Sequence, residues 1–128
     1  MTRQILVVDD EPDVAELFRQ NFRREIRRGD YAFDFALSGE AALAVLESRP
    51  AEVVMVLSDI NMPGMSGVEL LAEIRGRWPE VHCYMITAYG DAATEAKVRD
   101  LGAERFLAKP VDFARLKDDL AQTLDEAP

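Results

Sequence analysis

The apolar positions of this chain fall into five short runs, each followed by a segment with helical spacing. The runs lie near residues 4–8, 33–36, 53–58, 82–87 and 105–108. Short apolar runs of this kind are typical of buried strands, whereas apolar residues spaced three and four positions apart are typical of amphipathic helices. The pattern therefore predicts five consecutive β-α units.

Several predicted helix ends carry residues that can satisfy the free backbone groups there. Ser66 and Glu69 form a capping-box pattern before the third helix. Pro12 suits the first turn of the first helix, where its missing N–H is not needed. The other residues expected at helix N-caps are Ser38, Asp91 and Asp112.

The predicted inner faces of the helices differ in bulk. The inner face of the first helix is expected to consist of Val14, Leu17, Phe18, Phe22 and Ile26. That of the second helix consists of Ala42, Val45 and Leu46, and that of the fifth helix of Phe113, Leu116, Leu120 and Leu124. The face of the fourth helix is expected to consist of Ala92, Ala93, Ala96, Val98 and Leu101. At about 25 cal/mol per Å² of apolar burial, small side chains anchor a helix weakly. The fourth helix either packs closely nonetheless or is loose enough to shift.

Five β-α units predict an α/β fold, a mainly parallel sheet with helices on both faces. Right-handed crossovers leave few topologies, and the flavodoxin-like strand order 2-1-3-4-5 suits five units best. We expect one domain over residues 1–128. In such sheets, sites form at the carboxyl ends of the strands, near the change of strand order between the first and third.

Acidic residues and a lysine stand at those strand ends. Asp9 and Asp10 follow the first run, Asp59 ends the third, and Lys109 follows the fifth. A carboxylate at the end of a buried strand is costly unless it is paired. Three carboxylates within about 5 Å of one another repel by roughly 3 kcal/mol per pair at an effective dielectric near 20, so a cation must offset them. Lys109 and a bound dication are both candidates, and a plain acidic rim paired with Lys109 is the alternative.

All-oxygen ligands favour Mg²⁺, and no loop of the EF-hand type supports calcium. Mg²⁺ beside a carboxylate and a lysine is suited to phosphoryl transfer. Asp59 is the natural nucleophile, since an aspartate can carry a covalent phosphoryl group. The hydroxyl of Thr87, at the end of the fourth run, could bind a phosphoryl oxygen, although threonine is also an ordinary strand residue.

Composition narrows the class of protein. The formal net charge of −9 argues against direct nucleic-acid binding, which needs a basic surface. The sequence shows neither a membrane-spanning apolar stretch nor a signal-peptide pattern. A single cysteine, Cys83, excludes an internal disulfide and fits a cytoplasmic location. We interpret Cys83 as a buried apolar residue and the only histidine, His82, as incidental.

Four segments together resemble the receiver domain of two-component response regulators, including single-domain regulators of the chemotaxis type. They cover nearly the whole chain in order, and only their combination is specific. The segments are Val7-Val8-Asp9-Asp10-Glu11-Pro12, Asp59-Ile60-Asn61-Met62-Pro63-Gly64-Met65-Ser66-Gly67, Thr87-Ala88-Tyr89-Gly90 and Phe106-Leu107-Ala108-Lys109-Pro110.

The resemblance implies a role for each site residue. Asp59 would accept a phosphoryl group from the phosphohistidine of a sensor histidine kinase or a histidine phosphotransfer protein. Mg²⁺ would be bound by Asp10, by Asp59 and by the backbone carbonyl of Asn61, with Asp9 acting through water. Lys109 would pair with the phosphoryl group. Such a domain is not an ordinary enzyme, although it assists its own phosphorylation and dephosphorylation.

The resemblance also implies a conformational switch. Thr87 would move toward the phosphoryl group, and the ring of Phe106 would follow into the space that Thr87 leaves. The face of the fourth helix, fifth strand and fifth helix would then change shape, which allows a phosphorylation-dependent homodimer. Phe106 replaces the tyrosine expected there and lacks its hydroxyl. Pro110 would follow a cis peptide bond.

Two further features bear on regulation and partners. Tyr89 stands where the family tunes its rates, and we hypothesise that it shields the phosphoryl group from water. Arg19, Arg23 and Arg27 form a basic stripe on the first helix, either a solvated face near a helix end or a docking surface for an acidic partner.

Three alternatives to a phosphate-accepting receiver remain. A haloacid-dehalogenase-like phosphatase also uses an aspartyl-phosphate, but Asn61 stands where that class has a second acid, and no cap domain is evident. A flavodoxin would need a phosphate loop where this chain has Asp9 and Asp10. The third is an interaction module that takes no phosphate. The input signal, kinase and effector are not encoded in recognisable motifs.

Overall fold

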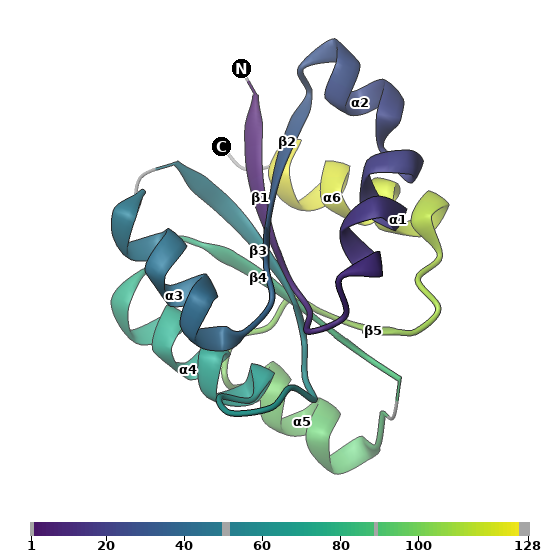
Figure 1. The fold of residues 1–128 in the computed structure, drawn as a ribbon. Helices are drawn as coiled ribbons and strands as arrows, with labels where there is room; N and C mark the ends of the chain where they lie inside the picture. The colour runs from purple at the N-terminus through teal and green to yellow at the C-terminus, as the bar shows by residue number, and fades with distance from the viewer. Residues whose placement is uncertain (1, 50–51, 89, 126–128) are drawn as a thin grey trace.

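A computed structural model describes residues 2–49, 52–88 and 90–125. Its five strands form one parallel sheet in the order β2-β1-β3-β4-β5, which confirms the predicted flavodoxin-like topology (Figure 1). The strands are β1 (Arg3–Val8), β2 (Tyr31–Ala36), β3 (Val53–Asp59), β4 (His82–Thr87) and β5 (Arg105–Ala108).

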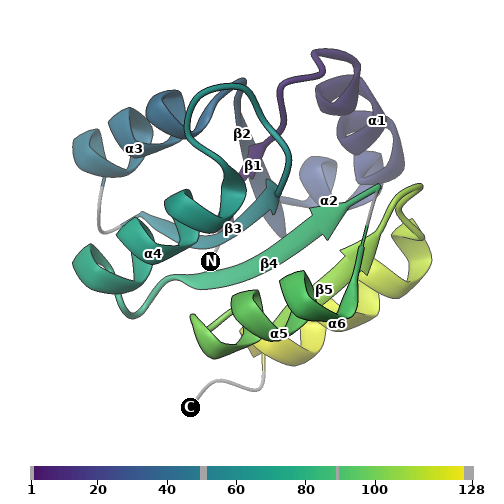
Figure 2. The same cartoon turned by 90° about the horizontal axis from the view of Figure 1, so that it is seen from below.

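Helices cover both faces of the sheet. The helices are α1 (Asp13–Asn21), α2 (Arg23–Arg28), α3 (Gly39–Ser48), α4 (Gly67–Arg77), α5 (Ala92–Asp100) and α6 (Phe113–Asp125). Figures 1 and 2 show α1, α2 and α6 on one face and α3, α4 and α5 on the other. Within the described part of the chain, no helix is both long and apolar enough to cross a membrane.

The sheet separates two apolar clusters. Successive residues of a strand point to opposite faces, so Met55 and Leu57 of β3 belong to the cluster beneath α1 and α6, while Val56 belongs to the cluster beneath α3 and α4. All three side chains are buried. Burial on both faces explains the continuous apolar runs in the sequence.

The predicted helix caps are confirmed. The side chain of Ser38 accepts a hydrogen bond from the backbone N–H of Ala41 at 3.0 Å. Ser66 and Glu69 form the reciprocal capping box. Two aspartates accept from backbone N–H groups in the same way, Asp91 from Thr94 at 2.7 Å and Asp112 from Arg115 at 3.2 Å.

The first predicted helix is interrupted at Phe22. This residue has φ −105° and ψ 19°, so α1 ends there and α2 begins one residue later. The ring of Phe22 stays fully buried, 4.9 Å from that of Phe33. Beyond the interruption, Ile26 is 38% exposed. The prediction of one continuous apolar face is wrong at Ile26 and at Leu17, which is 49% exposed.

The inner face predicted for the fourth helix, α5, is confirmed at Val98 and Leu101 but not at its alanines. Ala92, Ala93 and Ala96 are all exposed, so their predicted inward placement is wrong. The inner face is centred on the buried Val98, with Leu101 half-buried beside it. Since one large side chain anchors this helix, the expectation of a weakly held element rests on Val98 rather than on a row of alanines.

Candidate functional site

The acidic residues converge at the carboxyl ends of β1 and β3, which are neighbours in the sheet. Asp9 follows the last residue of β1, and Asp59 is the last residue of β3. Both are 6% exposed, whereas Asp10 is exposed. One carboxylate oxygen from each of the three residues lies within 4.8 Å of the others. The predicted acidic cluster is therefore present in the fold.

Lys109 joins this cluster from the end of β5. Its ammonium group donates hydrogen bonds to Asp9 at 2.8 Å and to Asp59 at 3.2 Å. The other oxygen of Asp9 accepts from the backbone N–H of Glu11 at 2.9 Å. The backbone N–H of Lys109 bonds to the carbonyl of Thr87 at 2.9 Å, and the peptide bond to Pro110 is cis, as expected.

Burial and pairing shift the ionisation of this site in opposite directions. Burial raises the pKa of Asp59, and the hydrogen bond and positive charge of Lys109 only partly offset that rise. Burial lowers the pKa of Lys109, but the hydrogen bonds and charges of Asp9 and Asp59 outweigh it and leave that pKa raised. Lys109 therefore keeps its positive charge at neutral pH, while the Asp59 carboxylate is held in a less favourable setting than in water.

Gly67 allows α4 to begin directly against the backbone of Asp59. A Cβ atom at Gly67 would lie 2.1 Å from the carbonyl oxygen of Asp59 and 2.7 Å from the Cα of Ile60. The backbone N–H of Gly67 also donates to the carbonyl of Ile60 at 2.8 Å. Sequence reasoning assigned this glycine no role of its own, although glycine is the usual residue where the backbone is approached closely.

Thr87 ends β4 beside the acidic cluster and is 1% exposed. The side-chain amide of Asn61 donates a hydrogen bond to its hydroxyl at 3.3 Å, a contact that sequence reasoning did not anticipate. Phe106 lies on the next strand, β5, and is half-buried against the cluster that includes Val98. Tyr89, expected to tune the rates, lies outside the described residues.

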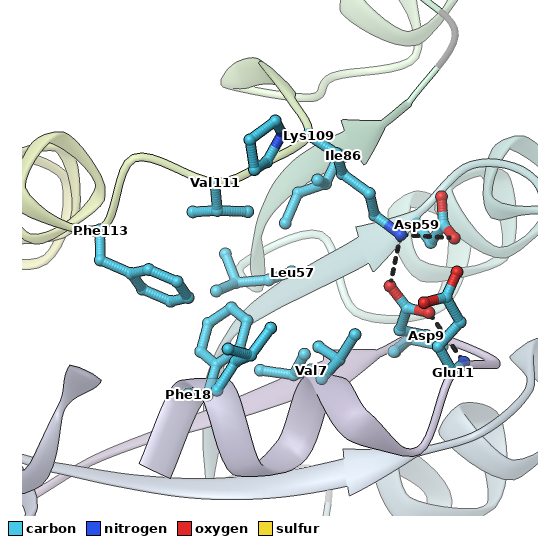
Figure 3. A pocket seen from close by; sticks show the side chains of 14 residues that line it. Val7, Asp9, Glu11, Phe18, Leu57, Asp59, Ile86, Lys109, Val111 and Phe113 are labelled. Atoms are coloured by element: carbon cyan, nitrogen blue, oxygen red, sulfur yellow. Dashed lines mark hydrogen bonds and ion pairs between the residues drawn. The ribbon is translucent and has the colours of Figure 1, made fainter. Parts of the chain in front are cut away.

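A cavity of about 440 Å³ adjoins the acidic cluster (Figure 3). It lies between α1 and the segment that joins β5 to α6, and Asp9, Glu11, Asp59 and Lys109 form its polar end. The remaining walls are largely apolar, with Phe18, Leu57, Val111 and Phe113 among them. The cavity thus brings apolar side chains close to the carboxylates.

The other sequence candidates lie away from this site. Cys83 is buried, and burial raises the pKa of its thiol to about 12, in agreement with its interpretation as an apolar residue. His82 contacts Glu104 instead of the acidic cluster. Arg19 stands over the ring of Phe35 at 4.9 Å.

The interruption at Phe22 divides the predicted basic stripe between two helices. Arg19 lies on α1, whereas Arg23 and Arg27 are exposed on α2. Helix α2 ends beside the start of β1, where the carbonyl of Gly29 accepts a hydrogen bond from Thr2. These two arginines therefore lie toward the end of the sheet opposite the acidic cluster.

The donor set of the cluster is suited to a hard divalent cation. Two buried carboxylates and one exposed carboxylate offer oxygen ligands, and the exposed position of Asp10 leaves one side open to water. Mg²⁺ prefers such sites, because it keeps several water ligands and takes one or two carboxylates. A single ammonium group does not neutralise three carboxylates, which leaves a net negative site for a cation.

Comparison with known proteins identifies the family of this chain. A family model described as the response regulator receiver domain matches residues 5–121. Response regulator protein PilR of Pseudomonas aeruginosa is 38% identical over 97% of this chain, which spans 27% of the length of PilR. Sporulation initiation phosphotransferase F of Bacillus subtilis is 31% identical over 97% of this chain and 95% of its own length.

A solved structure shares both the fold and part of the sequence. The response regulator protein TrrA from Thermotoga maritima, crystallised in complex with Mg(2+)-BeF, has a TM-score of 0.80 and 33% identity. The alignment covers 95% of this chain and 99% of TrrA. The family model matches most of this chain, and sporulation initiation phosphotransferase F aligns with it almost from end to end. The chain therefore belongs to the response regulator receiver domain family of two-component signalling.

Proposed function

We propose that Asp59 is the phosphoacceptor of this receiver domain and that a phosphohistidine is its donor. The observation that carries the proposal is the position of Lys109, whose ammonium group contacts both Asp9 and Asp59 at 2.8 and 3.2 Å. A cation held there would neutralise charge on a phosphoryl group bound to Asp59. The donor belongs to a sensor histidine kinase or a histidine phosphotransfer protein, whose imidazole approaches along the apolar cavity beside α1.

The transfer is a displacement at phosphorus. An oxygen of the Asp59 carboxylate forms a bond to phosphorus as the bond from phosphorus to the donor imidazole nitrogen breaks. The imidazole leaves with the electron pair of that bond. Lys109 holds phosphoryl oxygens in place, and burial of Asp59 keeps the reacting oxygen poorly solvated.

Mg²⁺ is the cofactor that fits this proposal. Asp10 and Asp59 would bind it directly, with the backbone carbonyl of Asn61, while Asp9 would act through water because both of its oxygens already accept hydrogen bonds, one from Lys109 and one from the backbone N–H of Glu11. When bound, Mg²⁺ supplies positive charge for the phosphoryl oxygens and for the crowded carboxylates. The related protein TrrA was crystallised with Mg(2+)-BeF, which supports the choice of metal.

The structural readout would begin at Thr87. Its hydroxyl, which now accepts from Asn61, would turn to a phosphoryl oxygen, and the ring of Phe106 would move with it. The surface that changes is formed by α5, β5 and α6, the elements predicted as the fourth helix, fifth strand and fifth helix. We expect the effector, or a second copy in a phosphorylation-dependent homodimer, to bind this surface.

The domain acts as a signalling acceptor, and its assistance to its own dephosphorylation is part of the proposal. The phosphatase alternative loses ground because Asn61, two residues after Asp59, bonds to Thr87 and supplies no second acid. The single-domain assignment of residues 1–128 and a cytoplasmic location remain predictions.

The decisive experiment uses acetyl phosphate as a small donor. Intact mass should show a gain of one phosphoryl group with Mg²⁺, little gain with EDTA, and none in Asp59→Asn. Asp10→Asn should lower the yield at limiting Mg²⁺ and recover at high Mg²⁺, because it removes a metal ligand without removing the acceptor. A phosphoryl group that persists in Asp59→Asn would refute the assignment, and steady hydrolysis of unrelated phosphate esters would favour a phosphatase.

A further inference from the structure

We propose that Gly90 positions the ring of Phe106, because only a residue without a side chain leaves room for that ring beside Thr87. The inference rests on the proposed function, since it assigns Gly90 to the switch of the same site. It names a positioning residue in the connection between β4 and α5, two residues before α5 begins, outside the acidic cluster and the pair of switch residues.

Gly90 leaves a space that the ring of Phe106 partly fills. A Cβ atom at this position would lie 2.9 Å from Cε2 and 3.3 Å from Cζ of Phe106, and 3.5 Å from Cγ2 of Thr87. Real Cβ contacts almost never fall below 3.0 Å. The outer end of the Phe106 ring therefore occupies the place of a side chain at residue 90, with the methyl group of Thr87 close by.

The backbone gives no other reason for a glycine at this position. Among the described residues, the glycines with positive φ are Gly29, Gly64 and Gly102. Gly90 is not one of them, so a residue with a side chain can adopt its backbone conformation without the strain that positive φ imposes. Gly90 is also exposed, so the obstacle to a side chain is the ring of Phe106 rather than a surrounding core.

The ring position matters because Phe106 also lines the surface proposed to change. It forms part of a groove of about 410 Å³ over β5, together with Arg99, Arg105 and Arg115. A methyl group at residue 90 would meet the outer end of the Phe106 ring, and because that ring also lines the groove, moving it would change the groove. Gly90 thus favours the ring position found here, and a substitution would change the balance between ring positions before any phosphoryl group binds.

The test compares Gly90→Ala with Phe106→Leu and with the double variant. Leucine lacks the outer ring atoms that a methyl group at residue 90 would meet. Aromatic NMR signals of Phe106, assigned by their loss in Phe106→Leu, should shift in unphosphorylated Gly90→Ala. The rate constant for phosphorylation by acetyl phosphate with Mg²⁺ should change at least threefold, in either direction, because ring position and acceptance are linked.

Rescue separates positioning from general damage. In the Phe106→Leu background, the Gly90→Ala change should alter the same rate constant by less than 1.5-fold. Gly76→Ala is the matched control, because a Cβ there has nothing within 4 Å and should leave the Phe106 signals and the rate unchanged. If Gly90→Ala folds poorly, restored folding and rate in the double variant support the proposal.

The proposal for Gly90 would be overturned if the Phe106 signals did not shift in Gly90→Ala. It would also be overturned if Gly90→Ala changed the phosphorylation rate constant equally in wild type and in the Phe106→Leu background. Failure of the proposed function has a different signature. Wild type would then gain no phosphoryl mass, whereas the NMR comparison of unphosphorylated variants would still report whether Gly90 positions the ring.

Discussion

The Nζ atom of Lys109 lies 3.2 Å from a carboxylate oxygen of Asp59, and 50 residues of chain separate the two. The lysine also bonds to Asp9 at 2.8 Å, so one ammonium group serves two buried carboxylates. Because the two carboxylates share one ammonium group, the negative charge of neither is fully neutralised. The unphosphorylated domain therefore carries an electrostatic cost at its site, which stability measurements can detect.

Asp59→Asn should stabilise the metal-free domain at pH 7. The substitution removes a charge that burial disfavours and leaves Lys109 paired with Asp9. We expect a gain of about 1 kcal/mol, or roughly 4 °C in Tm for a domain of this size. Thermal unfolding in EDTA measures it, and Asp10→Asn, at an exposed position, is the control that should change Tm less. An unchanged or lower Tm in Asp59→Asn would contradict the argument.

The increase in Tm expected for Asp59→Asn over wild type should depend on pH in a defined direction. The folded-state pKa of Asp59 is raised above its ordinary value of 3.8. Stability linked to such a group is fully present below the unfolded-state pKa and is lost as pH rises through the folded-state pKa. The Tm difference between the variant and wild type should therefore be largest near neutral pH and shrink below about pH 4. If the Tm difference between the variant and wild type grew in acid instead, the folded-state pKa of Asp59 would be lowered and not raised.

Lys109→Met should destabilise the domain and increase its response to Mg²⁺. The variant keeps most of the apolar stem of the lysine but leaves Asp9 and Asp59 without their shared donor. We expect a loss of about 2 kcal/mol without metal. Saturating Mg²⁺ should then raise Tm by more in the variant than in wild type, because it replaces the missing charge. Equal Tm gains in the two proteins would show that Lys109 contributes little to the balance of charge.

Gly67→Ala and Gly76→Ala should have opposite effects although both glycines lie in α4. A Cβ at Gly67 would overlap the carbonyl oxygen of Asp59, whereas a Cβ at Gly76 meets nothing within 4 Å. Urea unfolding should show a loss of about 3 kcal/mol or more for the first and a gain of up to about 1 kcal/mol for the second. Two losses of similar size would mean that helix α4 tolerates no change at its glycines for some other reason.

Cys83 should react slowly with iodoacetamide in the folded protein. Its side chain is buried, and burial raises the pKa of the thiol to about 12, so the reactive thiolate is scarce at pH 8. Labelling followed by mass should be slower by at least about 100-fold than in urea. Rapid labelling of the folded protein would show that β4 opens more readily than its burial implies.

Charge reversal at Arg23 and Arg27 should leave phosphorylation by acetyl phosphate unchanged. Both side chains are exposed on α2, toward the end of the sheet opposite Asp59. Phosphotransfer from the cognate kinase tests the docking interpretation: a fall of at least fivefold in Arg23→Glu/Arg27→Glu would support an acidic partner. An unchanged rate would support a solvated face. A changed rate with acetyl phosphate would contradict the separation of α2 from the site.

The sequence predicted the strand order and the meeting of Asp9, Asp10, Asp59 and Lys109 because both follow from local patterns. Buried strands are marked by apolar runs, and residues at the ends of parallel strands share one edge of the sheet. Helix caps such as Ser38 were equally predictable, because a cap is a relation between residues three positions apart.

The features that the sequence did not reveal depend on contacts between distant segments. At the interruption, the ring of Phe22 packs on that of Phe33, a contact that no spacing rule contains. The outward direction of Ala92 and Ala96 is set by the seating of Val98 on the sheet. Likewise, the bond from Asn61 to Thr87 joins the ends of two strands. Periodicity determines which residues share a helix face. It does not determine which face turns toward the sheet when several faces carry only small side chains.

The pairing of Lys109 with Asp9 has a consequence for folding, since 100 residues of chain separate the two. Asp59 gains its neighbours only when β1, β3 and β5 lie in one sheet, so the reactive constellation has a high contact order and assembles with the whole fold. A chain that is still incomplete, or one that ends before β5, has the Asp59 carboxylate but lacks the ammonium group of Lys109 beside it. Under the proposed function, only molecules whose sheet is complete carry every group that surrounds Asp59.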